Sequence, residues 1–574
     1  MLVQIAAALL LIVGSLGMTP VAAAERPAPP PHESPPTGPW ILPAHEIAAR
    51  PVTPRRTFTR DGYLSVQVNV DAFGANILGD AANEPSFAID PTAPNRLVVG
   101  WRQFDSVASN FRQAGWGYSH DGGRTWAFPG VLVPGEFRSD PVLGVNHDGA
   151  FYYHSLAINP YRCYMHRSDD AGASWSNSVY AYGGDKAWFA IDRTRGAAAD
   201  SIYTYWAFPT HGFNWSRDGG LSFAEPIPLP VLIRWGSITV GVDGEVYLVG
   251  GYDTAFLISR VWNAQHPEET PEFDLSRDTG LGGAPRSYGG PNPGGMLGQA
   301  WIAADHSDGP TRGNVYVACA ADRYGDDPLD IMFNRSEDRG DTWADPPVRI
   351  NDDPPHPDAW QWFAAMSVAP NGRIDVVWYD TRNSLQTNIC ELYYAYSTDA
   401  GASWSTNIAV SPPFDSWVGW PNQNKIGDYI QCHSDRTGVD VIYAATFNGE
   451  QDVYYLRIGP RDCNENGIPD AEDIAGGFSA DCNSNGIPDT CELAAGTATD
   501  GDGDGVLDEC QHDCPGDVDG DNDIDQADLG LLLVAYERPP DDPLYDPRAD
   551  FTGDALIDQQ DLGILLANYE TICD

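Results

Sequence analysis

Short runs of apolar and aromatic residues, each bounded by Gly, Pro, Asn or Asp, recur from about residue 58 to residue 460. Runs of this length between turn residues are typical of β-strands. The first set of four predicts strands at Ser86–Asp90, Arg96–Arg102, Gly115–Ser119 and Thr125–Val133. Few long helical patterns appear, so the pattern predicts an all-β body.

The same order of strands repeats along the body. The first strand of each set is predicted at Ser86–Asp90, Pro141–Asn146, Trp188–Asp192, Ser237–Val242, Trp301–Asp305, Phe363–Ala369 and Asp428–His433. The last set ends at Asp452–Ile458 without a fourth strand, and Leu64–Asp71, ahead of the first set, can supply one. Seven units closed by strands from both ends of the body predict a seven-bladed β-propeller without free edges.

One motif, S-x-D-x-G-x-[ST]-aromatic, marks these units. Its copies lie within Tyr118–Phe128, Ser168–Trp175, Ser216–Phe223, Ser336–Trp343 and Ser397–Trp404. An Asp that accepts hydrogen bonds from turn amides and a Gly at positive φ predict a hairpin turn. Successive motif aspartates are 49, 48, 120 and 61 residues apart, so one unit has lost its copy, although Ser276–Gly280 matches half of the pattern.

The motif resembles the Asp box of the sialidase superfamily. That resemblance implies a propeller, with six blades as the alternative to the seven counted from the repeats. It also implies a site in which arginines hold a substrate carboxylate, an Asp is the acid/base and a Tyr is the nucleophile. The chain contains no Arg-Ile-Pro tripeptide, which marks the first sialidase arginine, so no catalytic residue is assigned by motif.

Candidate residues follow instead from the predicted blade geometry. The Asp-box turn joins strands three and four, so the loops between strands two and three and between blades lie on the opposite face, where we expect function. There, arginines are candidates to clamp a substrate carboxylate, and acids and tyrosines are candidates for catalysis. These candidates are Arg102, Arg138, Arg323, Arg382, Asp140, Asp380, Tyr379 and Tyr429.

Two functions fit these candidates. The first is carbohydrate-directed hydrolysis by an exo-acting glycoside hydrolase. The second is a non-catalytic propeller that binds glycan or protein at the cell surface, because an Arg after a strand often pairs with a neighbouring carboxylate and Asp380–Asn383 could form an Asx-type turn.

The charge is distributed unevenly. The formal net charge is −48, which argues against nucleic acid and anionic membranes as partners. Residues 462–574 hold 30 Asp and Glu against 2 Lys and Arg. Because these acids recur at fixed spacing, they predict binding of divalent cations.

Three loops after residue 461 have the oxygen spacing of a calcium loop, with Gly at the sharp turn. Their predicted ligands are Asp462, Asn464, Asn466, Asp470 and Asp473; Asp481, Asn483, Asn485, Asp489 and Glu492; and Asp500, Asp502, Asp504 and Asp508. These cysteine-linked loops resemble thrombospondin type 3 repeats, which implies a calcium-filled stalk over residues 461–514.

Two further loops, each followed by an apolar helix, start 33 residues apart within residues 515–574. Their predicted Ca²⁺ ligands are Asp517, Asp519, Asp521, Asp525 and Asp528, and Asp550, Thr552, Asp554, Asp558 and Asp561. The pair resembles a type I dockerin module, which implies a cohesin-like partner and polysaccharide breakdown. The positions that help to select a cohesin would be Gln526–Ala527 and Gln559–Gln560, and a calcium-stiffened anchor is the alternative.

The N-terminus predicts export. An apolar run, Ile5–Met18, precedes the small residues Ala22–Ala24, so residues 1–24 read as a signal peptide, and the Pro-rich residues 25–57 as a linker. No later apolar run is long enough to span a membrane. Export permits disulfides among the six cysteines after residue 461, and a Cys390–Cys432 bridge is a further option.

Overall fold

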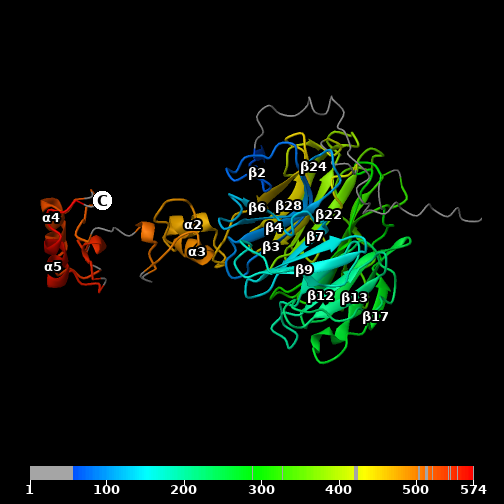
Figure 1. Ribbon diagram of the computed structural model, residues 1–574, viewed down its shortest axis with the longest axis horizontal. Helices are drawn as coiled ribbons and strands as arrows, with labels where there is room; N and C mark the ends of the chain where they lie inside the picture. The colour runs from blue at the N-terminus through cyan, green and yellow to red at the C-terminus, as the bar shows by residue number, and fades with distance from the viewer. Residues whose placement is uncertain are drawn as a thin grey trace, which may run out of the picture. The chain divides into compact units, whose positions relative to one another are not determined.

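A computed structural model describes residues 56–572, apart from 287–288, 326, 419–423, 502–504, 511–514, 520, 522, 541, 543 and 553. The predicted signal peptide and almost all of the Pro-rich segment lie outside the described residues. Within them, seven antiparallel sheets form the blades of a β-propeller (Figure 1). The count of seven is confirmed, and the alternative of six blades is wrong.

The blades follow one another along the chain. Blade 1 comprises β3 (Ala81–Ile89), β4 (Leu97–Phe104), β5 (Gln113–Ser119) and β6 (Ala127–Val131). Blade 2 comprises β7 (Ser139–Val145), β8 (Phe151–Ala157), β9 (Arg162–Ser168) and β10 (Val179–Tyr180). Blade 3 comprises β11 (Trp188–Ile191), β12 (Ile202–Trp206) and β13 (Gly212–Ser216). Blades 4 and 5 comprise β14 (Ile238–Val240), β15 (Val246–Tyr252), β16 (Ala255–Val261) and β17 (Leu275–Asp278), and β18 (Trp301–Ala304), β19 (Val315–Ala321), β20 (Asp330–Ser336) and β21 (Val348–Arg349). Blade 6 comprises β22 (Gln361–Val368), β23 (Ile374–Asp380), β24 (Ile389–Ser397), β25 (Ile408–Ala409) and β26 (Phe414–Asp415).

Blade 7 closes the ring with strands from both ends of the body. Its strands β27 (Gln431–Ser434), β28 (Val439–Ala445) and β29 (Asp452–Ile458) are joined by β2 (Tyr63–Gln67), which pairs antiparallel with β29. Strand β1 (Thr57–Arg60) pairs with the outer side of β2. The predicted N-terminal fourth strand is confirmed. Because β29 is covered, blade 7 presents no bare third strand to solvent.

Each Asp box forms the turn that the sequence predicts. In the first, the Asp121 carboxylate accepts bonds from Ser119 Oγ at 2.7 Å and from Thr125 N at 2.9 Å. Gly123 has a φ of +85°, and a Cβ there would lie 2.3 Å from the Tyr455 ring, so only glycine fits. The box is therefore a scaffold that fixes a hairpin.

Blade 4 lacks an Asp box. Its third and fourth strands are joined by a longer connection that begins with the 3₁₀ helix η1 (Trp262–Gln265). The partial match at Ser276–Gly280 falls largely on the fourth strand, β17, and not on a turn between strands three and four. The match is coincidental, because the turn that an Asp box would staple is absent there.

The cysteines divide between the two parts of the chain. Within the propeller, Cys163, Cys319, Cys390 and Cys432 are buried and free, so a Cys390–Cys432 bridge is wrong. Apolar burial raises the pKa of each of these thiols, which keeps them protonated. After residue 461, the structure forms two disulfides, Cys463–Cys491 and Cys482–Cys510. Cys514 and Cys573 lie outside the described residues.

Helices occur mainly after the propeller. They are α2 (Asp470–Gly476), α3 (Asp489–Ala495), η2 (Asp508–Cys510), α4 (Gln526–Ala535), η3 (Pro547–Ala549) and α5 (Gln559–Ala567). Helices α4 and α5 share a small apolar core that includes Ile524, Leu532 and Leu565. Among the described residues, no helix has the length and apolar character needed to cross a membrane.

We expect an Asp-box carboxylate to contribute to stability alone. Replacing Asp170 by Ala removes the acceptor for Ser168 Oγ, Ser174 N and Ser174 Oγ, and should lower the free energy of unfolding by about 1–2 kcal/mol. The control is Asp169→Ala, which removes only an exposed pair with Arg167 and should cost less than about 0.5 kcal/mol. Urea unfolding followed by tryptophan fluorescence measures both, and equal losses would contradict this assignment.

Candidate functional site

The first strands of all seven blades line a central cavity of about 540 Å³. Its walls include apolar residues such as Leu143 and Phe189 and charged residues such as Arg193, Asp435 and Glu465. None of the eight propeller residues predicted from the sequence lines this cavity. The chemistry-bearing groups lie instead at the opposite ends of the blades from the Asp boxes, where each first strand begins.

Six buried charges of alternating sign meet there, and we call them the axial charge chain. They are Asp140, Lys186, Asp428, Lys425, Glu84 and Arg102. They come from blades 1 and 2 and from the segments that lead into blades 3 and 7, so residues remote in sequence converge there.

The middle of the axial charge chain is its tightest part. Lys186 Nζ lies 3.2 Å from Asp140 Oδ1 and 2.6 Å from Asp428 Oδ2, and Lys425 Nζ also lies 2.6 Å from Asp428 Oδ2. Lys186 and Asp140 are about 4% and 2% exposed. Charges this deeply buried are stable only when they are paired.

The chain ends at blade 1. Lys425 Nζ lies 3.3 Å from Glu84 Oε1, and Arg102 Nε lies 3.1 Å from Glu84 Oε2. Arg102 also donates from Nε to Asn83 Oδ1 at 2.8 Å. The guanidinium of Arg102 is therefore held inside the protein by a carboxylate of its own blade.

The ions of the Asp140–Lys186 pair stay charged. Burial raises the pKa of Asp140, but the Lys186 ammonium outweighs it and holds that pKa well below its usual range. Burial lowers the pKa of Lys186, while Asp140 and Asp428 more than offset it and hold that pKa well above its usual range. The lowered pKa of Asp140 does not suit a general acid, which must hold a proton at the working pH.

An unusual backbone conformation aims these charges at one another. Glu84, Asp140 and Lys186 have φ values of +51°, +46° and +56°, in the left-handed region that non-glycine residues rarely adopt. For Glu84 and Asp140, the ladder between the first and second strands shifts register at the same point. A bulge at the start of the strand turns the charged side chain inward.

Both predicted nucleophiles lie in the hydrophobic core. The Tyr429 hydroxyl donates to the Pro141 carbonyl at 2.7 Å, and the Tyr379 hydroxyl donates to the Ala444 carbonyl. Burial raises the pKa of each far above its usual range. The Asp-box resemblance implies a nucleophilic Tyr that a Glu activates, and neither hydroxyl has a Glu among its described hydrogen-bond partners.

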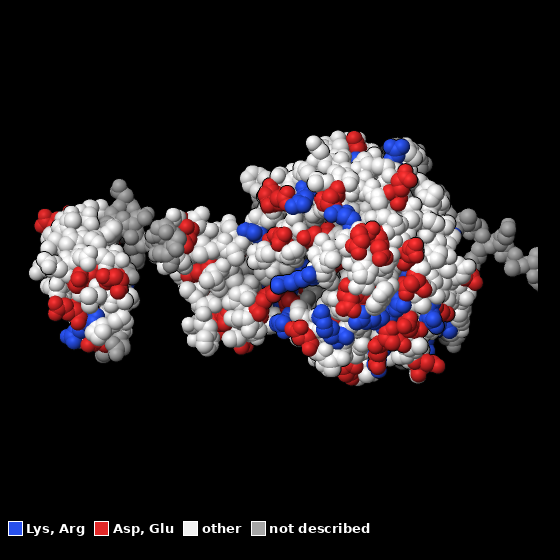
Figure 2. All heavy atoms as spheres, turned by 90° about the horizontal axis from the view of Figure 1, so that it is seen from below, with Lys and Arg blue, Asp and Glu red and all other residues white. Residues whose placement is uncertain are grey.

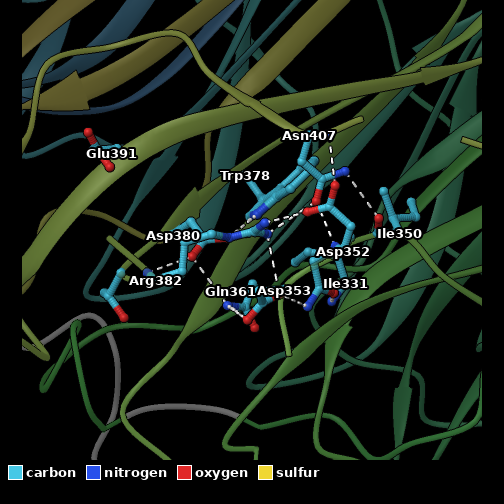
Figure 3. Close-up of polar contacts among 12 residues, drawn as sticks. Ile331, Ile350, Asp352, Asp353, Gln361, Trp378, Asp380, Arg382, Glu391 and Asn407 are labelled. Atoms are coloured by element: carbon cyan, nitrogen blue, oxygen red, sulfur yellow. Dashed lines mark hydrogen bonds and ion pairs between the residues drawn. The ribbon is translucent and has the colours of Figure 1, made fainter. Parts of the chain in front are cut away.

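A second charged cluster, the blade 5–6 network, surrounds Arg382 at the end of β23 (Figure 3). The guanidinium contacts Asp380 Oδ2 at 2.8 Å, Asp352 Oδ1 at 2.6 Å and Asp353 Oδ1 at 3.3 Å. It also lies 4.5 Å from the centre of the Tyr393 ring. Its side chain is 13% exposed and that of Asp352 is 46% exposed, so one side of the network reaches solvent.

The network continues into blade 5. Arg349 lies 3.3 Å from Asp353 and 3.2 Å from Asp327, and it also pairs with Asp330. Arg323 Nη1 completes the network at 3.2 Å from Asp330 Oδ2. Three arginines thus share five aspartates.

The excess of acids changes the titration of two members. Burial, with Asp330 and Asp353 nearby, raises the pKa of Asp327 to about 7. Burial also raises the pKa of Asp380, although Arg382 and hydrogen bonds from Arg382 and Trp378 oppose the shift. Of the two predicted acids, Asp380 is therefore the one whose pKa is raised, whereas that of Asp140 is lowered.

The four predicted arginines do not surround one position. Arg102 pairs with Glu84, and Arg138 pairs with Glu136 at 2.6 Å. Arg323 and Arg382 belong to the blade 5–6 network, where their carboxylates are already supplied. A clamp needs several unneutralised arginines aimed at one point, and the structure does not assemble it from these four.

Several charged residues in these clusters escaped the sequence analysis. Glu84 carries a signal that was available, because Glu84-Pro85 and Asp140-Pro141 both place an acid and a proline at the start of a first strand. Asp352 and Asp353 lie in a polar loop whose approach to Arg382 depends on the packing of blade 5 against blade 6. Glu391 faces Asp380 across the β23–β24 ladder.

The first two predicted calcium loops have the same internal geometry. In the first, Asp462 accepts from Asn466 N and Gly467 N, and Asp473 accepts from Asn464 and Asn466 side chains. In the second, the corresponding bonds run to Asp481 from the main chain, and to Glu492 from the side chains of Asn483 and Asn485. The carboxylate and amide oxygens of both loops fit a hard cation such as Ca²⁺.

The remaining loops are described in part. In the third, Asp500 accepts from Gly505 N and Asp508 from Gly501 N, while Asp502 and Asp504 lie outside the described residues. In the fourth, Asp517, Asp519 and Asp521 each place an oxygen within 4.8 Å of the others.

The fourth and fifth loops lead into capped helices. Asp525 with Asp528, and Asp558 with Asp561, form capping boxes at the starts of α4 and α5. In the fifth loop, Asp550 accepts from Ala555 N, and Asp561 accepts from Thr552 N. Asp554 accepts from Leu556 N in the same loop. The donor sets fit Ca²⁺ here as well.

Acidic and basic side chains are interspersed on the propeller face seen in Figure 2. This face therefore presents no broad patch of one sign. The negative net charge of the chain arises largely from the residues after 461.

We expect the axial charge chain to be required for folding stability. Lys186→Met removes the buried ammonium that faces the Asp140 and Asp428 carboxylates, so it leaves excess negative charge in the interior. The free energy of unfolding should fall by about 3–5 kcal/mol. Adding Asp140→Asn to this variant should recover part of the loss. Chemical unfolding followed by tryptophan fluorescence measures both, and a loss below about 1 kcal/mol would mean that the chain is not buried as described.

No protein-family model and no curated protein sequence matches the chain. Among solved structures, it is similar to a protein of unknown function from Dyadobacter fermentans, with 14% identity, a TM-score of 0.40 and coverage of 69% of this chain and 98% of that one. The chain is also similar to the Hadza microbial sialidase Hz136, with 13% identity, a TM-score of 0.36 and coverage of 66% of this chain and 65% of that one. A third similar structure is a GH93 α-L-arabinofuranosidase of Fusarium graminearum, with 12% identity, a TM-score of 0.30 and coverage of 48% of this chain and 92% of that one. At these values, the likeness does not define a function for this chain.

Proposed function

We propose that the protein is a secreted, carbohydrate-directed propeller that acts as a glycoside hydrolase on the loop face of blades 5 and 6. The observation that carries the proposal is the partly exposed blade 5–6 network. In it, Asp380 is a buried acid with a raised pKa, and its Oδ2 lies 2.8 Å from the Arg382 guanidinium. Carboxylates and arginines grouped over aromatic rings are the groups that bind sugar hydroxyls and apolar sugar faces.

The charge of the network favours a neutral sugar. Five aspartates surround three arginines, so the arginines have no unmet demand for a carboxylate. Even with Asp380 protonated, four aspartates face three arginines, so a substrate that carries its own carboxylate would meet no excess of positive charge. Sugar hydroxyls, in contrast, can donate to the exposed Asp352 and accept from Arg382. A neutral sugar differs from the carboxylate-bearing substrate that the Asp-box resemblance implies.

The proposed chemistry uses two carboxyl groups. Asp380, protonated, would donate to the leaving oxygen of the glycosidic bond. Glu391, its cross-strand neighbour, is held by Asn383 and Arg60 and would take the proton of the water that attacks the anomeric carbon as the glycosidic bond breaks. Two carboxyl groups in different environments are the usual requirement for glycoside hydrolysis. In this scheme, Tyr379 and Tyr429 support the core and take no part in the reaction.

A second candidate, glycan binding without catalysis, is favoured by one observation. Asp380 is 1% exposed, and its oxygens accept hydrogen bonds from Trp378, Gln361 and Arg382. Proton transfer from Asp380 requires these groups to rearrange when substrate binds. Binding through Arg382 and Asp352 requires no such change.

A panel of fluorogenic glycosides, neutral sugars and sialosides together, tests the hydrolase. We expect cleavage of a neutral glycoside, a fall in kcat/KM of about 100-fold or more for Asp380→Asn, and a rise in KM for Arg382→Gln. Because burial raises the pKa of Asp380, activity should persist to a higher pH than an ordinary Asp acid allows and fall as the pH rises through that pKa. Arg335→Gln, next to the blade 5 Asp box, is the matched control and should leave activity unchanged.

The outcomes separate the two candidates. If no glycoside is cleaved but neutral glycans are retained on an array and lost with Arg382→Gln, the protein is a binder. Cleavage of sialosides alone would contradict the charge argument. Full activity of Asp380→Asn would remove Asp380 from the mechanism.

For the residues after 461, we propose five calcium-binding loops and attachment through the last two loop-helix units. The support is the oxygen-rich geometry of the loops and the capped helices α4 and α5. We further propose that these units dock a cohesin-like protein when calcium is bound. The two disulfides fit an extracellular location, in agreement with the predicted signal peptide.

Calcium should be lost at single loops by single substitutions. Glu492→Gln removes the carboxylate at position 12 of the second loop, so the full chain should bind one Ca²⁺ fewer. The control Glu472→Gln changes an exposed acid of α2 outside the predicted ligand set and should not change the count. Equilibrium dialysis gives the number bound, and the same number for both variants would contradict the assignment.

A further inference from the structure

Three acids are buried together where the propeller closes. Asp80 precedes β3 of blade 1, Glu450 lies in the turn between β28 and β29, and Asp452 begins β29. Their exposed fractions are 4%, 0% and 0%. They belong neither to the axial charge chain nor to the blade 5–6 network, and the proposed function does not use them.

The three carboxylates point at one small volume. Each offers one oxygen, and these oxygens lie within 4.8 Å of one another. Asp80 Oδ2 accepts from Gln103 Nε2 at 2.7 Å, whereas Asp80 Oδ1 is buried without a hydrogen-bond partner among the described residues. A buried carboxylate oxygen with no donor destabilises the folded state unless a bound ion or a water molecule satisfies it.

Neutral amides donate to two of the acids. Asn69 Nδ2 donates to Asp452 Oδ1 at 2.9 Å, and Asn76 Nδ2 donates to Glu450 Oε1 at 2.8 Å. Across the described part of the chain, no Lys, Arg or His forms an ion pair with Asp80 or Asp452. Like charges at this separation repel strongly in a medium of low polarity, so Asp80 and Asp452 require a cation or protons to neutralise them.

We propose that Asp80, Glu450 and Asp452 bind one Ca²⁺ ion inside the propeller, separate from the loops after residue 461. The ligands are all oxygens, with no imidazole or thiolate, which favours a hard cation over zinc. Three carboxylates with neighbouring amide and water oxygens suit the flexible, oxygen-rich coordination of calcium.

This ion would join the two ends of the ring. Asp452 starts β29, and Asn69, which bonds to Asp452, also accepts from Val453 N at 2.9 Å just beyond the closing strand β2. Asp80 stands at the entry to blade 1. One cation would therefore link blade 7, the closing strand and blade 1, and calcium would stabilise the propeller itself.

The test uses the full chain and calcium as the probe. The measurements are the Ca²⁺ equivalents bound per chain, by equilibrium dialysis, and the thermal midpoint of the propeller, by tryptophan fluorescence, in calcium and in EGTA. For the wild type, we expect the midpoint to fall by several degrees in EGTA. For the double variant Asp80→Asn and Asp452→Asn, we expect one equivalent fewer and a midpoint that EGTA does not change.

Two controls isolate the site. Asp440→Asn changes another buried acid of blade 7, one that Arg457 and Arg461 already neutralise at 2.9 Å each, so its calcium count and its EGTA response should match the wild type. Glu492→Gln should lose an equivalent in the loops while its propeller midpoint still falls in EGTA. This pair separates the proposed site from the loops and from the proposed activity.

The site is refuted if the double variant binds as many Ca²⁺ ions as the wild type, or if the wild-type midpoint ignores EGTA. Neutralisation by protons predicts that result, together with a double variant more stable than the wild type at pH 7. Should the double variant not fold, Asp80→Asn alone is counted, and an unchanged number again refutes the site.

Discussion

The pairing of β2 with β29 is the constraint on which the rest of the propeller depends. Ser65 pairs with Leu456 and Gln67 with Tyr454, and Val68 N extends the contact to the Val453 carbonyl at 2.9 Å. This pairing joins segments almost four hundred residues apart, so its entropic cost is met only when all the blades are in place. Once formed, it removes the exposed edge of β29.

Ring closure also creates the clusters that carry charge. The axial charge chain crosses the junction, because Lys425 and Asp428 come from the segment leading into blade 7, while Glu84 and Arg102 come from blade 1. The buried acids Asp80, Glu450 and Asp452 lie at the same junction. An open ring would leave these charges unpaired, so the closed ring and the buried charges stabilise each other. The blade 5–6 network lies away from this junction and keeps one side open to solvent.

Much of the fold could be predicted from the sequence because it repeats. Each Asp box encodes a local turn, and five copies with regular spacing count blades without any knowledge of tertiary contacts. The closing strand followed from a missing fourth strand in the last repeat. Ser276–Gly280 matches only half of the motif and lacks its hydroxyl and aromatic residues. It does not form the Asp-box turn and lies largely on strand β17.

The site could be predicted only in part, because charge pairing is a tertiary property. Asp140 and Asp380 have the same side chain and lie at the same end of their blades, yet Lys186 lowers the pKa of Asp140 while burial raises the pKa of Asp380. The partner that lowers the pKa of Asp140, Lys186, comes from the segment that leads into the next blade, 46 residues away. Tyr379 and Tyr429 follow the same rule, since only packing shows that their hydroxyls meet main-chain carbonyls.

The central claim is that ligands engage the loop face of blades 5 and 6, opposite to the Asp boxes. Hydrogen–deuterium exchange with and without a bound neutral oligosaccharide tests it most directly, because each segment reports separately. The account predicts slower exchange within residues 350–361 and 380–391 and no change at the Asp-box turns. Protection confined to the Asp-box turns, or to the strands that line the central cavity, would contradict it.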